Sequence, residues 1–331
     1  MPMTVTNITN DYRHLIRQAL PDCLIETSFS FGKKYQGKVR DTYNLEDKLI
    51  LITTDRQSAF DRIIAAVPFK GQVLNLTSVW WFEQTESIIP NHLIAVPDPN
   101  VIIARKCQVF PIEFVMRHYI TGTTSTSLWT QYQQGIREYC GIRFPDGLRK
   151  NQRLNQPILT PTTKDKNHDR PVSPAEVMAE KWMTTAEWEE ASSAAIKLFQ
   201  FGMRVAAQHG LMLVDTKYEF GRDAEGRMMI IDEIHTPDSS RYWLANSYEE
   251  RFAQAKEPDN FDKEFLRLWL TEHCDPYHDK ILPEAPPDLI VTLASRYIQL
   301  YEMMTGKQFA FSTHPGPISQ RIMRNIAGYL G

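Results

Sequence analysis

Acidic side chains are concentrated in residues 210–243, which read GLMLVDTKYEFGRDAEGRMMIIDEIHTPDSSRYW. Four of them follow apolar runs in two groups, Asp215 with Glu219 and Asp232 with Glu233. Carboxylate oxygens suit Mg²⁺, which proteins usually hold through one or two carboxylates together with phosphate oxygens. The segment is therefore a candidate magnesium site.

Two cations, Lys217 and Arg241, stand beside these acids. Acids for a metal and cations for phosphates are the side chains that a phosphoryl-transfer site requires. The same pattern also fits a polar hairpin end whose charges are simply solvated, because ion-pair networks have the same composition as active sites.

Two apolar runs, residues 211–214 and 228–231, flank a turn rich in Gly, Asp and Arg. Such runs predict the two strands of a hairpin, which would bring the carboxylates of both groups together. A long helix is predicted over residues 185–209, with an apolar stripe and a stop at Gly210. Ser173, Pro174 and Glu176 predict a capped helix start just before it.

A glycine-rich segment, Gly32 to Val39, nearly matches the nucleotide P-loop pattern. Val39 replaces the hydroxyl residue that binds Mg²⁺, and the residues that follow favour a strand rather than a helix. We therefore reject a P-loop. A glycine turn that lies over phosphates, as in protein kinases, and a plain hairpin turn both remain open.

The segment from Arg117 to Ser127 places a glycine among hydroxyl residues after a predicted strand. It can bind an anion, or it can simply begin the helical pattern at Leu128. Further along, residues 157–170 are polar and lack periodicity, which predicts a long loop that could act as a lid.

The remaining elements follow from turn and capping signals. A helix is expected from Thr77 to Ile89, with Trp80, Trp81 and Phe82 in the core. Strands are expected at residues 101–106 and 114–117, with a hinge between them because Pro111 limits pairing. Helices are expected near residues 262–274 and 288–305.

The composition excludes several classes of protein. The chain has 331 residues, 42% of them hydrophobic and 23% charged, as in ordinary globular proteins. A net charge of −3 argues against non-specific nucleic-acid binding. We expect no membrane segment and no secretory signal. Four scattered cysteines without a CxxC pair favour a cytoplasmic location.

Taken together and in order, the motifs resemble those of one family, the phosphoribosylaminoimidazole-succinocarboxamide synthases, or SAICAR synthetases. The resemblance covers roughly Tyr35 to Trp243 and rests on Gly37-Lys38-Val39-Arg40-Asp41, Asp55-Arg56-Gln57-Ser58-Ala59-Phe60-Asp61, Lys70-Gly71, Arg117 with Thr121-Gly122, Thr160-Pro161-Thr162-Thr163-Lys164, Asp215-Thr216-Lys217-Tyr218-Glu219-Phe220-Gly221, and Asp232-Glu233 followed by Thr236-Pro237-Asp238-Ser239-Ser240-Arg241.

The resemblance implies a ligase of purine biosynthesis that joins L-aspartate to carboxyaminoimidazole ribonucleotide with ATP and Mg²⁺, giving SAICAR, ADP and phosphate. It implies a two-lobed α+β fold related to ATP-grasp enzymes and protein kinases, with ATP between the lobes. The expected lobes are residues 1–112, β-rich with the glycine loop, and residues 113–331, with a helical C-terminal extension.

The resemblance also assigns site residues. It implies ATP contacts from Gly37, Lys38, Val39, Arg40, Glu113, Lys217, Glu219 and Asp232, with Glu219 and Asp232 as the Mg²⁺ ligands. It implies substrate contacts from Asp55, Ser58, Arg117, Thr123, Lys164, Asp238, Ser239 and Arg241, and catalytic roles for Lys217, Arg117 and Arg241. Some members of the family carry Gly-Ser where this chain has Gly122-Thr123, so a hydroxyl is kept, and which one of residues 123–127 contacts a phosphate stays open.

Two other functions fit the same residues. One is a different ATP-dependent carboxylate–amine ligase or a small-molecule kinase, which would need no amine. The other is a regulatory nucleotide-binding module without turnover, although such a module need not keep every acid and cation. No partner beyond small-molecule substrates is implied, and the oligomeric state is left open.

Overall fold

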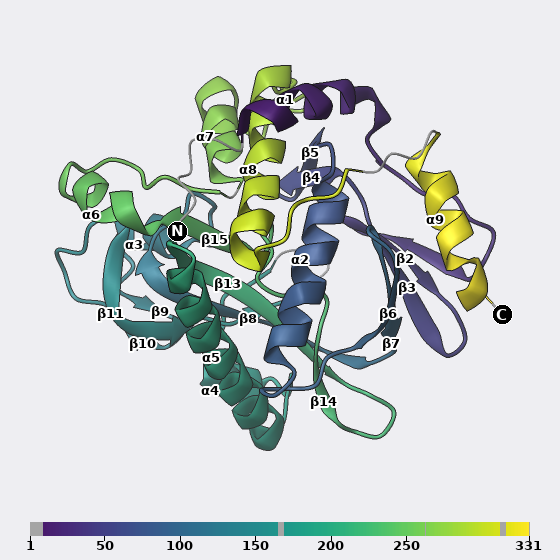
Figure 1. The fold of residues 1–331 in the computed structure, drawn as a ribbon. Coiled ribbons are helices and arrows are strands. Elements are labelled where there is room, and N and C mark those ends of the chain that lie inside the picture. Colours follow the sequence, from purple (N-terminus) through teal and green to yellow (C-terminus); the bar gives the residue numbers. More distant parts are fainter. Residues whose placement is uncertain (1–8, 165–168, 262, 312–315, 331) are drawn as a thin grey trace. The chain divides into compact units, whose positions relative to one another are not determined.

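The computed structural model describes residues 9–164, 169–261, 263–311 and 316–330 (Figure 1). In these residues the named strands pair only in antiparallel ladders, and helices alternate with them, which confirms the α+β class. No helix in this part of the chain is long and apolar enough to cross a membrane. The strands are β1 (Lys33–Gln36), β2 (Arg40–Asn44), β3 (Lys48–Thr53), β4 (Arg56–Ala59), β5 (Arg62–Ala66), β6 (Leu93–Asp98), β7 (Val101–Arg105), β8 (Gln108–Ile120), β9 (Glu138–Tyr139), β10 (Ile142–Arg143), β11 (Gln152–Leu159), β12 (Thr162–Thr163), β13 (Leu211–Arg222), β14 (Met228–Ile231) and β15 (Ser240–Leu244). The helices are α1 (Thr9–Gln18), α2 (Lys70–Thr85), α3 (Leu128–Gln133), α4 (Pro174–Ala179), α5 (Thr185–Gln208), α6 (Ala245–Ala253), α7 (Glu264–His273), α8 (Pro287–Thr305) and α9 (Ile318–Ile326), with short 3-10 turns η1 (Leu20–Asp22) and η2 (Ala327–Tyr329).

The first of two compact units takes in the described residues of 1–80, 93–106 and 261–331. Its main sheet has the order β1-β2-β3-β7-β6, and β4 and β5 form a separate hairpin. Side chains alternate between the faces of a strand, so Ile50, Ile52 and Ile103 share one face. Ile322 and Ile326 of α9 complete that buried cluster.

A second core of this unit is built around α8, which lies beside α1 (Figure 1). Tyr297 and Ile298 of α8 are fully buried with Ile16 of α1 and Leu266 of α7. These apolar contacts place the described residues of 261–331 with the first unit, whereas the sequence suggested one lobe from residue 113 to the end.

The second unit comprises residues 81–92 and 107–260. Its sheet has the order β11-β8-β13-β14, with β12 added to β8 and β15 added to β13. The predicted hairpin of β13 and β14 is confirmed, although β13 is longer than expected. Its turn is closed by Asp223, which accepts hydrogen bonds from the main-chain N–H of Glu225 and of Arg227.

Helix α5 covers one face of this sheet. A capping box of Thr184 and Glu187 begins the helix, and Gly210 with φ +71° follows its end, as the sequence predicted. Trp188 of α5 stacks on Phe114 of β8, with ring centroids 5.2 Å apart. The opposite face of the sheet is therefore left for polar side chains.

Three expectations about individual elements were wrong. Pro111 does not limit pairing, because β8 runs through it and its carbonyl accepts from the N–H of Lys164. The chain does pass from the first unit to the second between Lys106 and Cys107, where the expected hinge begins. The expected loop at 157–170 is partly strand, since β11 extends to Leu159 and β12 covers Thr162–Thr163, both paired with β8, and its residues 165–168 lie outside the described part. Helix α2 begins at Lys70, well before Thr77, while Trp81 and Phe82 are buried as expected.

Candidate active site

One face of β13 carries the chemistry predicted for residues 210–243. Asp215, Lys217 and Glu219 are two residues apart in the sequence, and they share one face of the strand because side chains alternate. The intervening Thr216 and Tyr218 are buried on the other face. Strands β8, β14 and β15 bring their own side chains beside this row through the ladder register.

A cluster of carboxylates and lysines forms at one end of the row. The register places Glu113 of β8 opposite Glu219, and it places Ile231, the residue before Asp232, on the other side of Glu219. Lys217 donates to Glu113 Oε1 at 2.6 Å and to Glu219 Oε1 at 3.3 Å. Lys164 forms an ion pair with the second oxygen of Glu219. The carboxylate–lysine cluster is therefore Glu113, Lys164, Lys217, Glu219 and Asp232.

The protonation state of Lys217 follows from this cluster. Burial by itself lowers the pKa of its ammonium group, but the negative charges of Glu113, Glu219 and Asp232 raise that pKa well above its ordinary value. Lys217 is therefore a permanent cation that can stabilise negative charge, and it cannot serve as a general base near neutral pH.

Two arginines form the other end of the row. Arg117 of β8 and Arg241 of β15 both stand opposite Asp215 in the ladder. Arg241 Nη1 lies 2.5 Å from Asp215 Oδ2, and Arg117 Nη1 lies 4.0 Å from the same oxygen. Arg117 Nε also donates to Thr160 Oγ1 at 2.8 Å. The arginine pair, Arg117 and Arg241, carries two charges against one, so it suits an anionic ligand with a planar or tetrahedral oxygen group.

The hydroxyl-rich turn after β8 lies against the arginine pair. Gly122 has φ +102°, and a side chain there would come within 3.0 Å of Arg241 Nη2 and 2.4 Å of Ser127 Oγ. Ser127 Oγ in turn bonds the N–H and the hydroxyl of Thr124. Ser127 also stands at the N-cap position of α3, so the expected helix start at Leu128 is confirmed, while anion binding by this segment stays a prediction.

The turn before β15 is held by its own hydrogen bonds. The Thr236 hydroxyl accepts from the N–H groups of Asp238 and Ser239 and donates to Glu233 Oε2. Asp238 and Ser239, both predicted to contact substrate, are half-buried on this rigid turn. His235, which precedes Thr236, is fully buried, and its Nε2 lies 2.5 Å from the Tyr218 hydroxyl.

The four acids of the sequence motif do not converge on one point. Asp215 forms an ion pair with Arg241, and Glu233 accepts from the Thr236 hydroxyl in the turn before β15. Only Glu219 and Asp232 therefore remain in the same cluster. The reason is strand geometry: four residues of β13 span about 13 Å, which separates Asp215 from Glu219. Thr160 and Glu233 both stand in quoted motifs, and each supports another site residue in a way that the sequence did not indicate.

The carboxylate–lysine cluster offers Mg²⁺ few protein ligands. Within the described ranges, no group of three or more His, Cys, Asp or Glu residues could hold a metal ion by itself. Two adjacent carboxylates, Glu219 and Asp232, nevertheless fit a cation that takes most of its ligands from phosphates and water. The cluster also has three acids against two lysines, and this excess negative charge favours a cation.

Other expected site residues belong to the first unit. The glycine loop (residues 37–40) joins β1 to β2, so a strand follows it and the rejection of a P-loop is supported. Lys38 is exposed and its ammonium lies 2.5 Å from Asp61 Oδ1. Ser58 is half-buried on β4. Asp55 is fully buried instead, and its two oxygens accept from the N–H groups of Leu24 and Gly71.

Comparison with known proteins connects this geometry to a family. Residues 33–283 match the family described as SAICAR synthetase. A phosphoribosylaminoimidazole-succinocarboxamide synthase of Legionella pneumophila (strain Paris) is 72% identical over 312 residues, covering 94% of this chain and 100% of the relative. A chloroplastic enzyme of the same name from Arabidopsis thaliana is 55% identical over 98% of this chain and 80% of its own length.

A solved structure gives the same answer for the fold. A SAICAR synthase from Saccharomyces cerevisiae complexed with SAICAR superimposes with a TM-score of 0.74 at 29% identity, covering 87% of this chain and 100% of the yeast protein. The motifs, the strand register and these relatives agree. The chain belongs to the SAICAR synthetase family and is a ligase of purine biosynthesis.

Proposed function

We propose that the protein joins the amine of L-aspartate to the carboxylate of carboxyaminoimidazole ribonucleotide, using ATP and forming an acyl phosphate on the way. The observation that carries the proposal is the row on β13, which has the carboxylate–lysine cluster around Glu219 at one end and the arginine pair beside Asp215 at the other. The two ends are about 13 Å apart, a separation that suits one substrate bearing an anionic group away from its reacting carboxylate.

The chemistry explains why ATP is needed. A carboxylate oxygen attacks the γ-phosphorus, the bond to ADP breaks, and the acyl phosphate forms. The amine nitrogen then attacks the acyl carbon, phosphate leaves with the original carboxylate oxygen, and the amine loses its proton to solvent. No protein nucleophile takes part, so the site must position reactants and neutralise charge.

The residues have distinct roles in this proposal. Lys217 stabilises the negative charge of the transferring phosphoryl group, since its charge is permanent. Glu219 and Asp232 would hold Mg²⁺, which when bound neutralises phosphate charge. Glu113 orients Lys217, and Lys164 pairs with Glu219. Arg117 and Arg241 bind the ribonucleotide in this proposal, because the pair carries two positive charges against the one negative charge of Asp215. A yeast relative complexed with SAICAR supports a ligand of this kind for the family.

The first unit contributes the glycine loop in this proposal. Gly37, Lys38, Val39 and Arg40 contact the ATP phosphates, and Ser58 contacts substrate. We also propose, on the motifs, a two-lobed relation to ATP-grasp enzymes and protein kinases and a cytoplasmic location. Thr123, Asp238 and Ser239 are proposed as further contacts to the ribonucleotide or to aspartate.

The order of chemistry is testable with heavy oxygen. The ribonucleotide is prepared with label in its carboxylate and is incubated with ATP, Mg²⁺ and aspartate. Mass spectrometry of the released phosphate should find one labelled oxygen there. Phosphate without label would overturn the acyl-phosphate route, and release of ADP that is unchanged when aspartate is omitted would indicate a kinase instead.

A further inference from the structure

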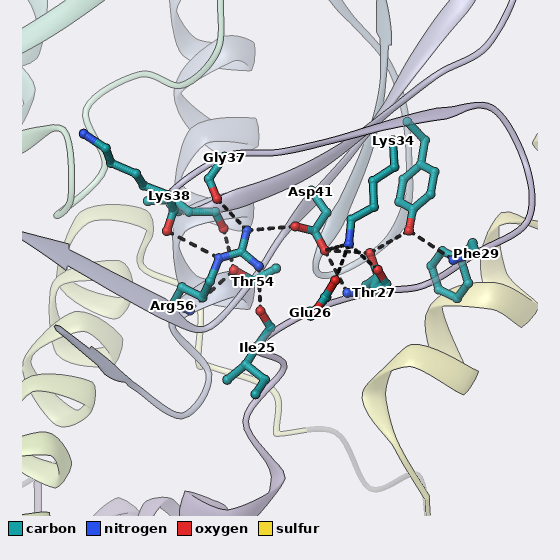
Figure 2. Close-up of polar contacts among 12 residues, drawn as sticks. Ile25, Glu26, Thr27, Phe29, Lys34, Gly37, Lys38, Asp41, Thr54 and Arg56 are labelled. Atoms are coloured by element: carbon teal, nitrogen blue, oxygen red, sulfur yellow. Dashed lines mark hydrogen bonds and ion pairs between the residues drawn. The ribbon is translucent and has the colours of Figure 1, made fainter. Parts of the chain in front are cut away.

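Three successive carbonyl groups of the glycine loop accept hydrogen bonds from two buried residues, which have no role in the function proposed above (Figure 2). Arg56 Nη2 donates to Gly37 O at 2.8 Å, and Arg56 Nε lies 3.4 Å from Lys38 O. Thr54 donates to Val39 O twice, from its hydroxyl at 2.6 Å and from its N–H at 3.0 Å. The loop clamp, Arg56 and Thr54, is almost completely buried.

Arg56 is itself fixed by acceptors outside the loop. Its Nη1 donates to Ile25 O at 2.6 Å, and its Nη2 donates to Asp41 Oδ1 at 2.8 Å (Figure 2). Asp41 also accepts from the N–H and hydroxyl of Thr27, at 2.7 and 2.8 Å. Burial alone would raise the pKa of Asp41, but these hydrogen bonds and the charge of Arg56 lower it. The carboxylate therefore stays ionised and holds the guanidinium in one orientation.

The direction of the carbonyls fixes the direction of the peptide N–H groups. In a planar trans peptide, the C=O of one residue and the N–H of the next point opposite ways, and the described chain has no cis peptide bond. The N–H groups of Lys38 and Val39 therefore point away from the clamp. Among the described residues neither of them donates a hydrogen bond. Successive N–H groups presented in this way suit an anion.

We propose that Arg56 is a positioning residue for the nucleotide: with Thr54 it holds the glycine loop in the conformation that offers its N–H groups and Lys38 to phosphate. The proposal rests on the function proposed above, which places ATP phosphates at this loop. In this proposal the clamp does not contact the nucleotide. It orders the loop before the nucleotide binds, so that binding loses less conformational entropy.

Arginine suits this position for a geometric reason. Its planar guanidinium reaches four acceptors in different directions, Ile25 O, Gly37 O, Lys38 O and Asp41 Oδ1, whereas an ammonium group on a lysine stem is a single point of donation. With Arg56→Lys, the loop would lose its fixed conformation. If the competent conformation is then populated about one tenth of the time, the apparent affinity for nucleotide falls about tenfold.

Lys34 offers a matched control within the same network. Its ammonium group also lies near Asp41, at 3.4 Å, and bonds Glu26 and the carbonyl of Thr27 (Figure 2). It touches no carbonyl of residues 37–39. Lys34→Met therefore removes a cation from the network and leaves the clamp in place.

The experiment measures binding of MgADP to the full chain by titration calorimetry, together with KM for each substrate. Arg56→Lys should weaken MgADP about tenfold and raise the KM for ATP, while the KM for the ribonucleotide changes less than about twofold. Thr54→Val should weaken MgADP about fivefold because one hydrogen bond is lost, and Thr54→Ser should restore it. Lys34→Met should bind MgADP like the wild type even where its thermal stability is lower.

Several other results would contradict the positioning role. Wild-type affinity in Arg56→Lys, or equal losses in Thr54→Val and Thr54→Ser, would overturn the positioning role. So would a loss in Lys34→Met as large as that in Arg56→Lys, because the network would then act only through general stability. If Arg56→Lys does not fold, the two Thr54 variants decide. A wild-type chain that binds no MgADP would overturn the proposed function itself and this proposal with it.

Discussion

The buried carboxyl group of Asp55 should make the stability of the first unit fall as the pH rises. Burial raises its pKa to about 6 from an ordinary value of 3.8, although the N–H groups of Gly71 and Leu24 and the charges of Lys70 and Arg321 act in the opposite direction. The folded state therefore binds the proton more tightly than the unfolded state. A difference of about two pKa units corresponds to about 3 kcal/mol in the free energy of unfolding.

The direction of this pH dependence can be measured by comparing the wild type with Asp55→Asn, whose side chain does not titrate. We expect the free energy of unfolding of the wild type, minus that of the variant, to be constant below about pH 4 and to fall by about 3 kcal/mol by about pH 7. Urea unfolding at a series of pH values gives this difference, and effects of other groups cancel in the subtraction.

Asp41 is the natural control, because it is equally buried but its pKa is lowered. Its contribution is present above its unfolded pKa and is lost as the pH falls through its folded pKa. The corresponding difference for Asp41→Asn should therefore fall on acidification, the opposite sign. A difference for Asp55→Asn that rises with pH would refute the reasoning, since it would mean that the two N–H bonds outweigh burial.

Three further predictions concern the site and its support. Asp232→Asn and Glu219→Gln should each lower kcat by orders of magnitude without unfolding the protein, and near-normal turnover at limiting Mg²⁺ would contradict the metal assignment. Arg241→Lys should raise the KM for the ribonucleotide through loss of the planar fork and leave the KM for ATP almost unchanged, so an effect confined to ATP would exclude this role. Gly71→Ala should destabilise the chain, because a Cβ there would lie 2.3 Å from the main-chain oxygen of Thr53; a thermal melting temperature equal to that of the wild type would show that the backbone adjusts.

The sequence predicted those features that depend on local chemistry. The β13–β14 hairpin, the capping box at Ser173 and the end of α5 at Gly210 are confirmed, because turn and cap residues act over a few positions. The family was also recognisable, because its motifs occur together and in order.

Features that depend on distant pairing were not predictable. Nothing near Pro111 indicates that β8 continues, since that depends on β12 and β13 pairing beside it. The motif acids were expected to converge, but the register between β13 and β15 places Arg241 opposite Asp215. Asp55 stands in a motif and resembles a ligand residue, yet its burial is set by the backbone of Leu24 and Gly71.

The alternation along β13 has a consequence for how this gene can change. Asp215, Lys217 and Glu219 serve chemistry on one face, while Thr216, Tyr218 and Phe220 fill the core on the other. A one-residue shift in a strand moves every side chain to the opposite face. Insertion or deletion of a single codon between Asp215 and Glu219 would therefore put charges into the core and aromatic rings into the site at once. A substitution changes one side chain of this strand and leaves the register intact, whereas an insertion or deletion would not be tolerated.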